Sequence, residues 1–439
     1  MRIMPAIIVA ALAAAAPARG QETNRAAAAL DLLRMLSRGE YPGAVCLFDD
    51  ALRAAMPAGA LAKTCSGLVA KAGRFEYIGP AGGGAGTVRV LCVFEKGAYE
   101  ARVDVDDGGK VVALAFSPAP TPSPAEELRP MPALFGEREV TVGEGGTALP
   151  GTLTMPAAAP AAVPAAVLVH DWGPRDRDES TGPNRPFRDL AWGLASRGVA
   201  ALRYEKRTKE HPPPLEGPAS RLTVEDETVA DALSAAKLLR GTAGVDGRRV
   251  FLVGKGFGGT LAPMIAVRDR GIAGIVILGG PTRPLEDVLL SRMAYLLRSG
   301  GTPAPGGDAQ LERLRAQVAR VKDRDLSEKT PSGDLPEGLP ASYWLGLRGY
   351  NPAGEAAGLN RPILVLQGGR DYSATEEDYR GWEKALGSRK NARLLWYPAM
   401  SGLFISGAGK AEPAEYLQRR RAFEERVLDE IASWIASAR

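Results

Sequence analysis

The chain has 439 residues, of which 45% are hydrophobic and 24% are charged, as in an ordinary globular protein. This length predicts two or three domains. The net charge of +4 is small and spread over interleaved acidic and basic residues, which argues against nucleic acid as a partner.

The first twenty residues have the pattern of a secretory signal peptide. Arg2 precedes the apolar run Ala6–Ala16, and Ala16-Pro17-Ala18 or Ala18-Arg19-Gly20 offers a cleavage site between small residues. The run is too short to span a bilayer, and no later segment is apolar enough to do so. We therefore expect cleavage of 1–20 and export to the periplasm or the medium; the alternative is an uncleaved N-terminal helix.

The region 22–117 changes from helical to strand periodicity halfway along. Helices are expected over 25–38, 41–56 and 58–71, and strands over 75–78, 87–94, 99–105 and 111–116. Helices followed by strands with hairpin turns predict a small α+β domain. It resembles the small cone-shaped domain of unknown function placed ahead of some exported bacterial hydrolases. That resemblance implies interaction with a protein partner or shielding; a stabilising appendage is the other interpretation.

All three cysteines, Cys46, Cys65 and Cys92, lie in this region. In an exported protein two of them could pair, and three buried thiols are the alternative. Their spacing indicates no zinc site, and no metal or cofactor is expected. A proline-rich stretch then predicts an extended linker over 118–136.

Strands and helices alternate through most of 137–439, which predicts a mostly parallel sheet wound on both faces. The expected strands are 138–142, 149–155, 165–169, 198–204, 249–253, 272–278, 362–367 and 392–397. The expected helices are 186–196, 224–239, 258–267, 376–386 and 419–436. The segment 283–350 interrupts the alternation with two amphipathic helices, which suits a lid over the carboxyl edge of the sheet.

The most informative stretch is Val250–Pro263, a buried strand that enters a helix through four glycines. A nucleophile elbow is built in this way and normally reads G-x-S-x-G. Here Gly256 stands where the serine is expected. Glycine removes the strain of about 1–3 kcal/mol that a side chain would carry at such a tip.

The order of elements is that of an α/β-hydrolase, in which the acid and the histidine follow the serine along the chain. Asp371, in a turn after a buried strand, fills the acid position. No histidine follows His211, so a general base of the usual kind is missing.

Several long runs resemble the secreted bacterial esterases of the dienelactone-hydrolase and serine-aminopeptidase branch of this fold, over nearly all of 137–439. These runs are 170–179, 182–191, 202–208, 341–344, 349–352 and 366–371. The family's elbow resembles G-H-S-x-G-G, so Lys255 and Gly256 replace its histidine and nucleophile. Its base loop resembles L-N-H-L-F, which implies that Gly402 stands at the base.

The candidate pocket residues are His170, Asp171, Trp172, Lys255, Phe257 and Trp344. His170 ends a strand where an oxyanion-hole loop belongs, and Asp171 and Trp172 replace small residues there, which predicts a blocked hole. We interpret His170 as a structural turn residue. Lys255 is expected to turn away from the pocket. His211, in a loop before three prolines, is considered as a relocated base and Ser373 as a relocated nucleophile, but nothing in the sequence activates Ser373.

The sequence therefore predicts an exported α/β-hydrolase with a helical lid and an N-terminal α+β domain, which lacks a Ser-His-Asp triad. The favoured hypothesis is a pseudoenzyme that binds a small ester-like or acyl ligand, or a partner. The alternatives are a carboxylic-ester hydrolase with relocated residues, and a scaffold in which the N-terminal domain does the binding.

Overall fold

The structure is a computed structural model that describes residues 19–73, 75–82, 86–94, 96–119, 134–157, 161–212, 221–299, 307–418 and 423–438. Residues 1–18 of the predicted signal peptide and 120–133 of the predicted linker lie outside this part of the chain. The chain divides into two compact units, Met1–Pro122 and Ser123–Arg439. Within the described ranges, no helix combines the length and the apolar character needed to cross a bilayer.

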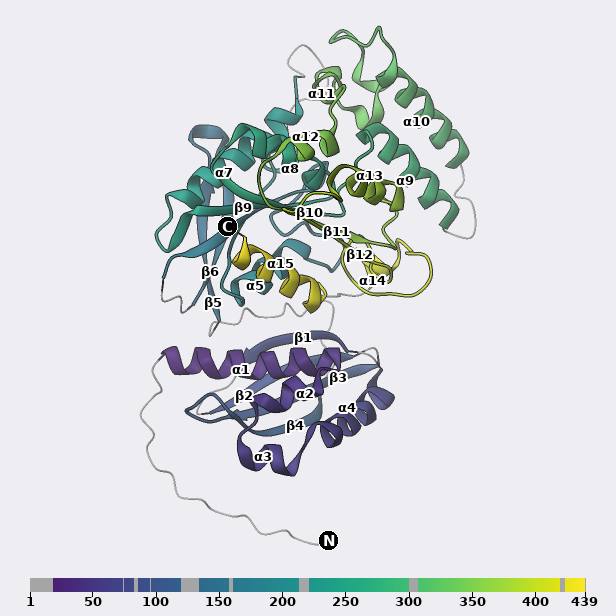
Figure 1. Ribbon diagram of the computed structural model, residues 1–439. Helices are drawn as coiled ribbons and strands as arrows, with labels where there is room; N and C mark the ends of the chain where they lie inside the picture. Colours follow the sequence, from purple (N-terminus) through teal and green to yellow (C-terminus); the bar gives the residue numbers. More distant parts are fainter. Residues whose placement is uncertain are drawn as a thin grey trace. The chain divides into compact units, whose positions relative to one another are not determined.

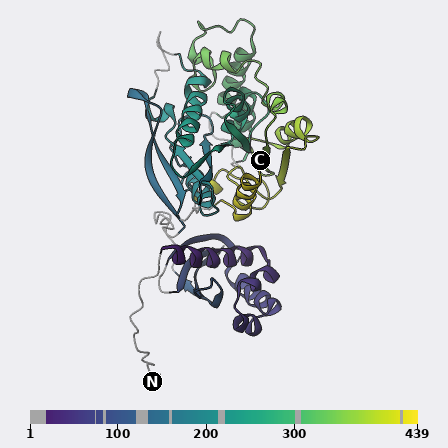
Figure 2. The ribbon, with the colours of Figure 1, turned by 60° about the vertical axis from the view of Figure 1, so that its left-hand side comes forward.

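The first unit combines helices with a four-stranded antiparallel sheet, whose strands follow one another in chain order (Figures 1 and 2). The helices are α1 (Arg19–Arg38), α2 (Tyr41–Ala44), α3 (Asp50–Ala55) and α4 (Ala58–Ala72). The strands are β1 (Phe75–Gly82), β2 (Thr87–Phe94), β3 (Gly97–Val105) and β4 (Val111–Ala119). All three cysteine thiols are free, and Cys46 is exposed, so neither predicted arrangement of the cysteines is found.

The single helix predicted over 41–56 is wrong. A short 3-10 turn, Val45–Leu47, follows α2, and the backbone of Phe48 is then extended. The Asp49 side chain accepts a hydrogen bond of 2.7 Å from the Leu52 N–H and so caps α3. Asp49 starts a new helix instead of continuing the first because aspartate favours the cap over the helix interior.

The second unit is built on an eight-stranded sheet with the order β12-β11-β10-β9-β7-β8-β6-β5. The adjacent strands β12, β11, β10, β9, β7 and β8 are parallel to one another. At the other edge, β6 pairs antiparallel with β8, and β5 pairs antiparallel with β6. The strands are β5 (Phe135–Val142), β6 (Leu149–Pro156), β7 (Val163–Val169), β8 (Ala200–Tyr204), β9 (Val245–Lys255), β10 (Ile272–Leu278), β11 (Ile363–Gly368) and β12 (Ala392–Tyr397). This confirms the predicted α/β-hydrolase fold class.

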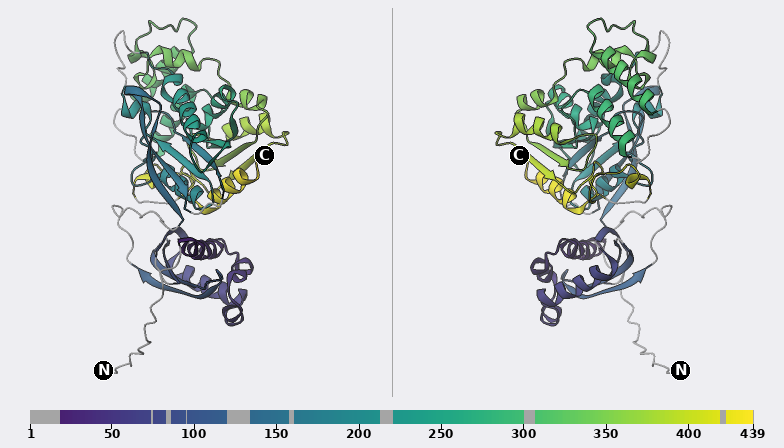
Figure 3. Two further views of the ribbon diagram at one scale, coloured as in Figure 1. Left: turned by 90° about the vertical axis from the view of Figure 1, so that its left-hand side faces the viewer. Right: turned by 90° about the vertical axis from the view of Figure 1, so that its right-hand side faces the viewer.

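Helices cover both faces of this sheet (Figure 3). On one face lie α5 (Pro186–Ala195) and α15 (Glu425–Ser437). On the other lie α7 (Ala230–Arg240), α8 (Phe257–Arg268), α12 (Pro352–Gly358) and α13 (Glu376–Leu386). Each central strand buries both faces, which explains its near-continuous run of hydrophobic residues. Short helices α6 (Arg207–Glu210) and α14 (Glu415–Gln418) lie in connections.

Two predicted helices begin later than expected. The stretch Glu225–Val229 is a π-helical turn, and regular α-helix starts only at Ala230. This wider turn buries Glu227, which accepts a hydrogen bond of 2.7 Å from Tyr343 Oη. The closing helix α15 starts at Glu425 instead of at 419, and residues 419–422 lie outside the described part.

The predicted lid contains α9 (Leu285–Ser299), α10 (Gly307–Lys322), two 3-10 turns and α11 (Ala341–Leu347). Its first residues are fixed to α13 by Asp378, whose side chain is fully buried. Asp378 accepts hydrogen bonds from the backbone N–H groups of Thr282, Arg283 and Thr375, at 2.9, 3.1 and 2.9 Å. It also accepts hydrogen bonds from Nε and Nη2 of the Arg283 guanidinium, the shortest at 2.8 Å.

Asp378 should therefore hold the lid in place. We expect Asp378→Ala to lower the free energy of unfolding by about 3–5 kcal/mol, because it leaves the Arg283 charge without its buried partner. The adjacent Glu377, 3.7 Å from Arg283 and 72% exposed, provides the matched control. Glu377→Ala should cost about 0–1 kcal/mol. Urea unfolding measures both, and equal losses would contradict the assignment.

Candidate functional site

The turn between β9 and α8 has the backbone geometry of a nucleophile elbow. Gly256 is the tip, with φ 54° and ψ −123°, a conformation that residues with side chains rarely adopt. It lies in the loop that joins the fifth strand of the second unit to its helix, as the sequence predicts for the serine position of this fold.

The space in front of Gly256 is filled by the Asp171 carboxylate. A Cβ atom added to Gly256 would lie 2.5 and 2.6 Å from the two carboxylate oxygens of Asp171. Asp171 Oδ1 accepts hydrogen bonds from the backbone N–H groups of Phe257, at 2.8 Å, and Trp172, at 2.9 Å. In this fold the oxyanion hole is made by the N–H after the nucleophile and an N–H from the loop after the third strand. Both are engaged here by the chain's own carboxylate.

Asp171 carries its negative charge in these surroundings. Burial alone would raise its pKa, but the Lys255 and Arg175 charges and the two N–H donors outweigh that effect, so the pKa lies below its ordinary value. The loop is fixed from behind by Lys206, whose Nζ donates a hydrogen bond of 2.8 Å to the Asp171 backbone oxygen.

The predicted acid and base positions adjoin each other. Asp371 follows β11, and its Oδ1 accepts hydrogen bonds from the N–H groups of Ser373, at 2.8 Å, and Ala374, at 3.2 Å. A Cβ atom on Gly402 would lie 2.8 Å from Asp371 Cγ and Oδ2. Burial raises the Asp371 pKa to about 6, although the N–H of Ser373 and the charge of Lys255 act against this.

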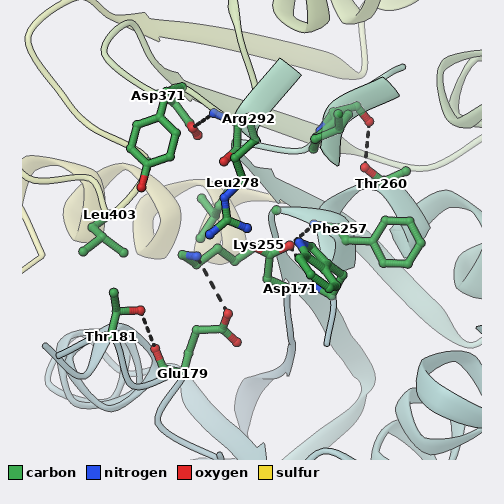
Figure 4. A pocket seen from close by; sticks show the side chains of 18 of the residues that line it. Asp171, Glu179, Thr181, Lys255, Phe257, Thr260, Leu278, Arg292, Asp371 and Leu403 are labelled. Atoms are coloured by element: carbon green, nitrogen blue, oxygen red, sulfur yellow. Dashed lines mark hydrogen bonds and ion pairs between the residues drawn. The ribbon is translucent and has the colours of Figure 1, made fainter. Parts of the chain in front are cut away.

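Gly256, Asp371 and Gly402 line one pocket, in which water-sized molecules can occupy about 110 Å³ (Figure 4). The lid helix α9 contributes Leu285, Val288 and Arg292 to its wall. Of the predicted pocket residues, Asp171, Trp172, Lys255 and Phe257 line it. The expectation that Lys255 turns away is wrong: its buried side chain extends into the pocket, with Nζ 3.8 Å from Glu179 Oε1.

His170 and Trp344 do not line this pocket. His170 is 1% exposed, and its ring packs between Phe187 and Tyr204, with both ring centroids 5.1 Å away. Burial, together with the Lys206 charge, lowers its pKa to about 3, so the ring is neutral. Trp344 lines a second cavity of about 400 Å³, which shares Phe257, Thr260, Arg283 and Leu285 with the first.

His211 and Ser373, considered as relocated catalytic residues, lie apart from each other. His211 Nε2 lies 3.1 Å from the Ala148 backbone oxygen, away from the pocket lining. Ser373 lines the pocket, but its described contacts run through backbone atoms, to Asp371 and Arg283. No histidine lies on the pocket wall to activate it.

Two residues of the pocket wall are not among the candidates named from the sequence. The first is Glu179. It is 1% exposed, has a positive φ of 57°, and its Oε2 atom has no hydrogen-bond partner within the described ranges. Burial raises its pKa, although the Lys255 charge opposes this. The second is Arg292 of the lid helix α9; the sequence predicts the lid but not which of its side chains enters the pocket.

Stacked tyrosines adjoin the pocket, and Tyr372 and Tyr416 line it. Tyr372, next to Asp371, stacks on Tyr295 of the lid helix α9 with ring centroids 5.0 Å apart, and on Tyr416 at 5.8 Å. Tyr295 Oη also donates a hydrogen bond of 2.5 Å to the Ala411 backbone oxygen. Across the described ranges, no group of three or more His, Cys, Asp or Glu residues could hold a metal ion.

The contact between Asp171 and Gly256 predicts a strong coupling between the two positions. We expect Gly256→Ala to destabilise the protein by at least about 1–3 kcal/mol, because its Cβ meets Asp171 and its φ is positive. The same change should cost less when Asp171→Gly has removed the carboxylate. Urea unfolding of the four proteins of this cycle measures the coupling, and additive effects would contradict the contact.

The raised pKa of Asp371 predicts a pH-dependent stability. Between about pH 4 and 6 the unfolded chain releases this proton before the folded one does, so the folded state loses stability as the pH rises. Asp371→Asn removes this loss, and the variant should gain stability relative to the parent protein between pH 4 and pH 7. Urea unfolding at both pH values tests this, with the exposed Asp325→Asn as control; a constant difference would contradict the raised pKa.

Comparisons with known proteins identify relatives for most of the chain. No protein-family model matches it. Esterase EstD of Thermotoga maritima is 37% identical over 345 residues, which cover 78% of this chain and 77% of EstD. Among solved structures, the esterase Pf2001 of Pyrococcus furiosus has 13% identity and a TM-score of 0.46; the match covers 69% of this chain and 92% of the Pf2001 chain. Est1E of Butyrivibrio proteoclasticus has 15% identity and a TM-score of 0.43; the match covers 68% of this chain and 99% of the Est1E chain.

The match to EstD extends over more than three quarters of both chains. Together with the order of strands in the eight-stranded sheet, it shows that the chain belongs to the EstD family of esterases with the α/β-hydrolase fold.

Proposed function

We propose that this member of the esterase family no longer transfers acyl groups through a serine and instead binds a small ester-like or acyl ligand in its lidded pocket. The observation that carries the proposal is the position of Asp171, which occupies the space of a side chain at 256 and accepts hydrogen bonds from the N–H groups of Phe257 in the elbow and Trp172 in the loop after β7. A tetrahedral intermediate needs those donors free, because its developing negative charge is stabilised there.

The two glycines support the same proposal independently. Gly256 carries no attacking oxygen, and Gly402, beside Asp371, carries no imidazole. In a well-studied serine protease, removal of the nucleophile or the base costs on the order of 10⁶ in rate. Loss of all these elements at once leaves the pocket but removes the means of acyl transfer.

The rival function is ester hydrolysis by other residues. The relationship of this chain to an esterase favours this rival. Asp371 supplies the specific observation, because a carboxylate in the pocket with a pKa of about 6 can act as a general base near neutral pH. This rival requires that hydrolysis be lost in Asp371→Ala.

We also propose that the protein is exported by means of residues 1–20, and that the first unit contributes an interaction with a protein partner. The support for export is the signal-peptide pattern in the sequence. The third hypothesis, a scaffold that binds only through this first unit, requires that pocket variants leave ligand-induced changes in melting temperature unaltered.

The proposed function predicts which repairs restore catalysis. The unmodified protein should not hydrolyse p-nitrophenyl acetate above the buffer rate. A variant that combines Gly256→Ser, Gly402→His and Lys255→His should remain almost inactive, because Asp171 still fills the site. Adding Asp171→Gly to this variant should raise the hydrolysis rate about 10²-fold or more, since it frees both N–H donors.

The readouts are the initial rate and covalent labelling by a fluorophosphonate probe. In the variants that carry Gly256→Ser, the probe should label position 256 only when Asp171→Gly is also present. Labelling of the unmodified second unit, or hydrolysis that disappears in Asp371→Ala, would establish the rival function instead. Thermal melting of each variant distinguishes a lost fold from a missing reaction.

A further inference from the structure

Two cationic side chains enter the pocket and lack hydrogen-bond acceptors among the described residues. Lys255 is 8% exposed, and its closest acidic partner, Glu179 Oε1, lies 3.8 Å away, beyond hydrogen-bonding distance. Arg292 reaches down from α9 into the same pocket (Figure 4). Its Nε atom is buried without an acceptor, and its recorded packing contact is the face of Trp172, 6.0 Å from the ring centroid.

Among the described residues, no carboxylate of the pocket forms a hydrogen bond with either cation. Asp171 Oδ1 accepts hydrogen bonds from two backbone N–H groups, and Asp371 Oδ1 accepts from two others. Glu179 Oε1 is shared by Lys255 and Arg175, each at 3.8 Å. Lys255 thus has an ion pair with Glu179 at 3.8 Å but no hydrogen-bonded carboxylate, and among the described residues Arg292 has neither. Buried donors of this kind favour a ligand that supplies acceptors.

The remaining walls favour an apolar group attached to the anion. Trp172, Phe257, Leu285, Val288 and Leu403 line the pocket around the two cations. The space is small, and four of its lining residues also border the second cavity beside Trp344. A ligand with a compact charged head and a short apolar tail matches this arrangement.

We propose that the pocket binds a small monocarboxylate, with its carboxylate between Arg292 and Lys255 and its apolar part against Trp172 and Phe257. The proposal rests on the proposed function, because it assigns the ligand of the same pocket. A planar guanidinium matches a carboxylate with two parallel hydrogen bonds, and the Lys255 ammonium adds a point charge. A doubly charged phosphate suits the site less well, because Asp171, Glu179 and Asp371 also face it.

The test measures binding to the full chain by isothermal titration calorimetry at neutral pH. The probes are hexanoate, its neutral isostere hexanamide, acetate and inorganic phosphate. Hexanoate should bind at least about tenfold more tightly than hexanamide, because charge-assisted hydrogen bonds are lost with the charge. It should also bind more tightly than acetate, which lacks the apolar tail.

Variants identify the cation that binds the carboxylate. Arg292→Gln should weaken hexanoate at least about tenfold and leave hexanamide unchanged within about twofold. The matched control is Arg298→Gln, an exposed arginine on the same helix α9, which should bind hexanoate normally. Lys255→Gln provides the second site variant, and thermal melting verifies that each variant is folded.

Four outcomes would overturn the carboxylate assignment: no heat from hexanoate, equal affinity for hexanamide, tighter binding of phosphate, or unchanged hexanoate affinity in Arg292→Gln. Binding of hexanamide alone would still leave a pocket-binding protein, so the proposed function would stand without this inference. Hydrolysis of p-nitrophenyl hexanoate that is lost in Asp371→Ala would overturn the proposed function itself, whatever the carboxylate affinity.

Discussion

The arrangement of this site depends on one carboxylate bound by two backbone N–H groups. Asp171 Oδ1 lies 2.8 Å from the Phe257 nitrogen and 2.9 Å from the Trp172 nitrogen, at the place where the fold would otherwise stabilise a reaction intermediate. The contact satisfies donors at the start of α8 and holds the loop after β7 against the elbow. Under the proposed function it is a structural bond in the position of a catalytic one, and a side chain at 256 would collide with the Asp171 carboxylate.

The retained scaffold and the altered site have different physical requirements. The sheet is stabilised by hydrophobic burial on both faces, in which the residues at 171, 256 and 402 take little part. Changes at these positions can therefore abolish a reaction while the fold persists. The positive φ of Gly256 shows that the backbone of the elbow remains even though no side chain occupies its tip.

The sequence allowed the fold, the elbow at Gly256 and the proximity of Asp371 to Gly402 to be predicted, because each follows from a strand, a turn and a fixed order of elements. It also allowed a blocked oxyanion hole at Asp171 to be anticipated. The direction of Lys255 and the arrival of Arg292 could not be predicted. These depend on side-chain rotamers and on how an insertion folds over the sheet, and hydrophobic periodicity reports neither. The breaks within the predicted helices at 41–56 and 224–239 have the same origin, since capping and tertiary burial overrode local propensity.

The lid helix that carries Arg292 is anchored around the pocket: Asp378 binds Arg283 just before the helix, and Tyr295 stacks on Tyr372 and donates a hydrogen bond to Ala411. The proposed ligand would therefore meet a guanidinium that is carried by an anchored helix and packs over Trp172. The helix itself would lose little conformational freedom on association, which would favour the binding of a molecule with few atoms.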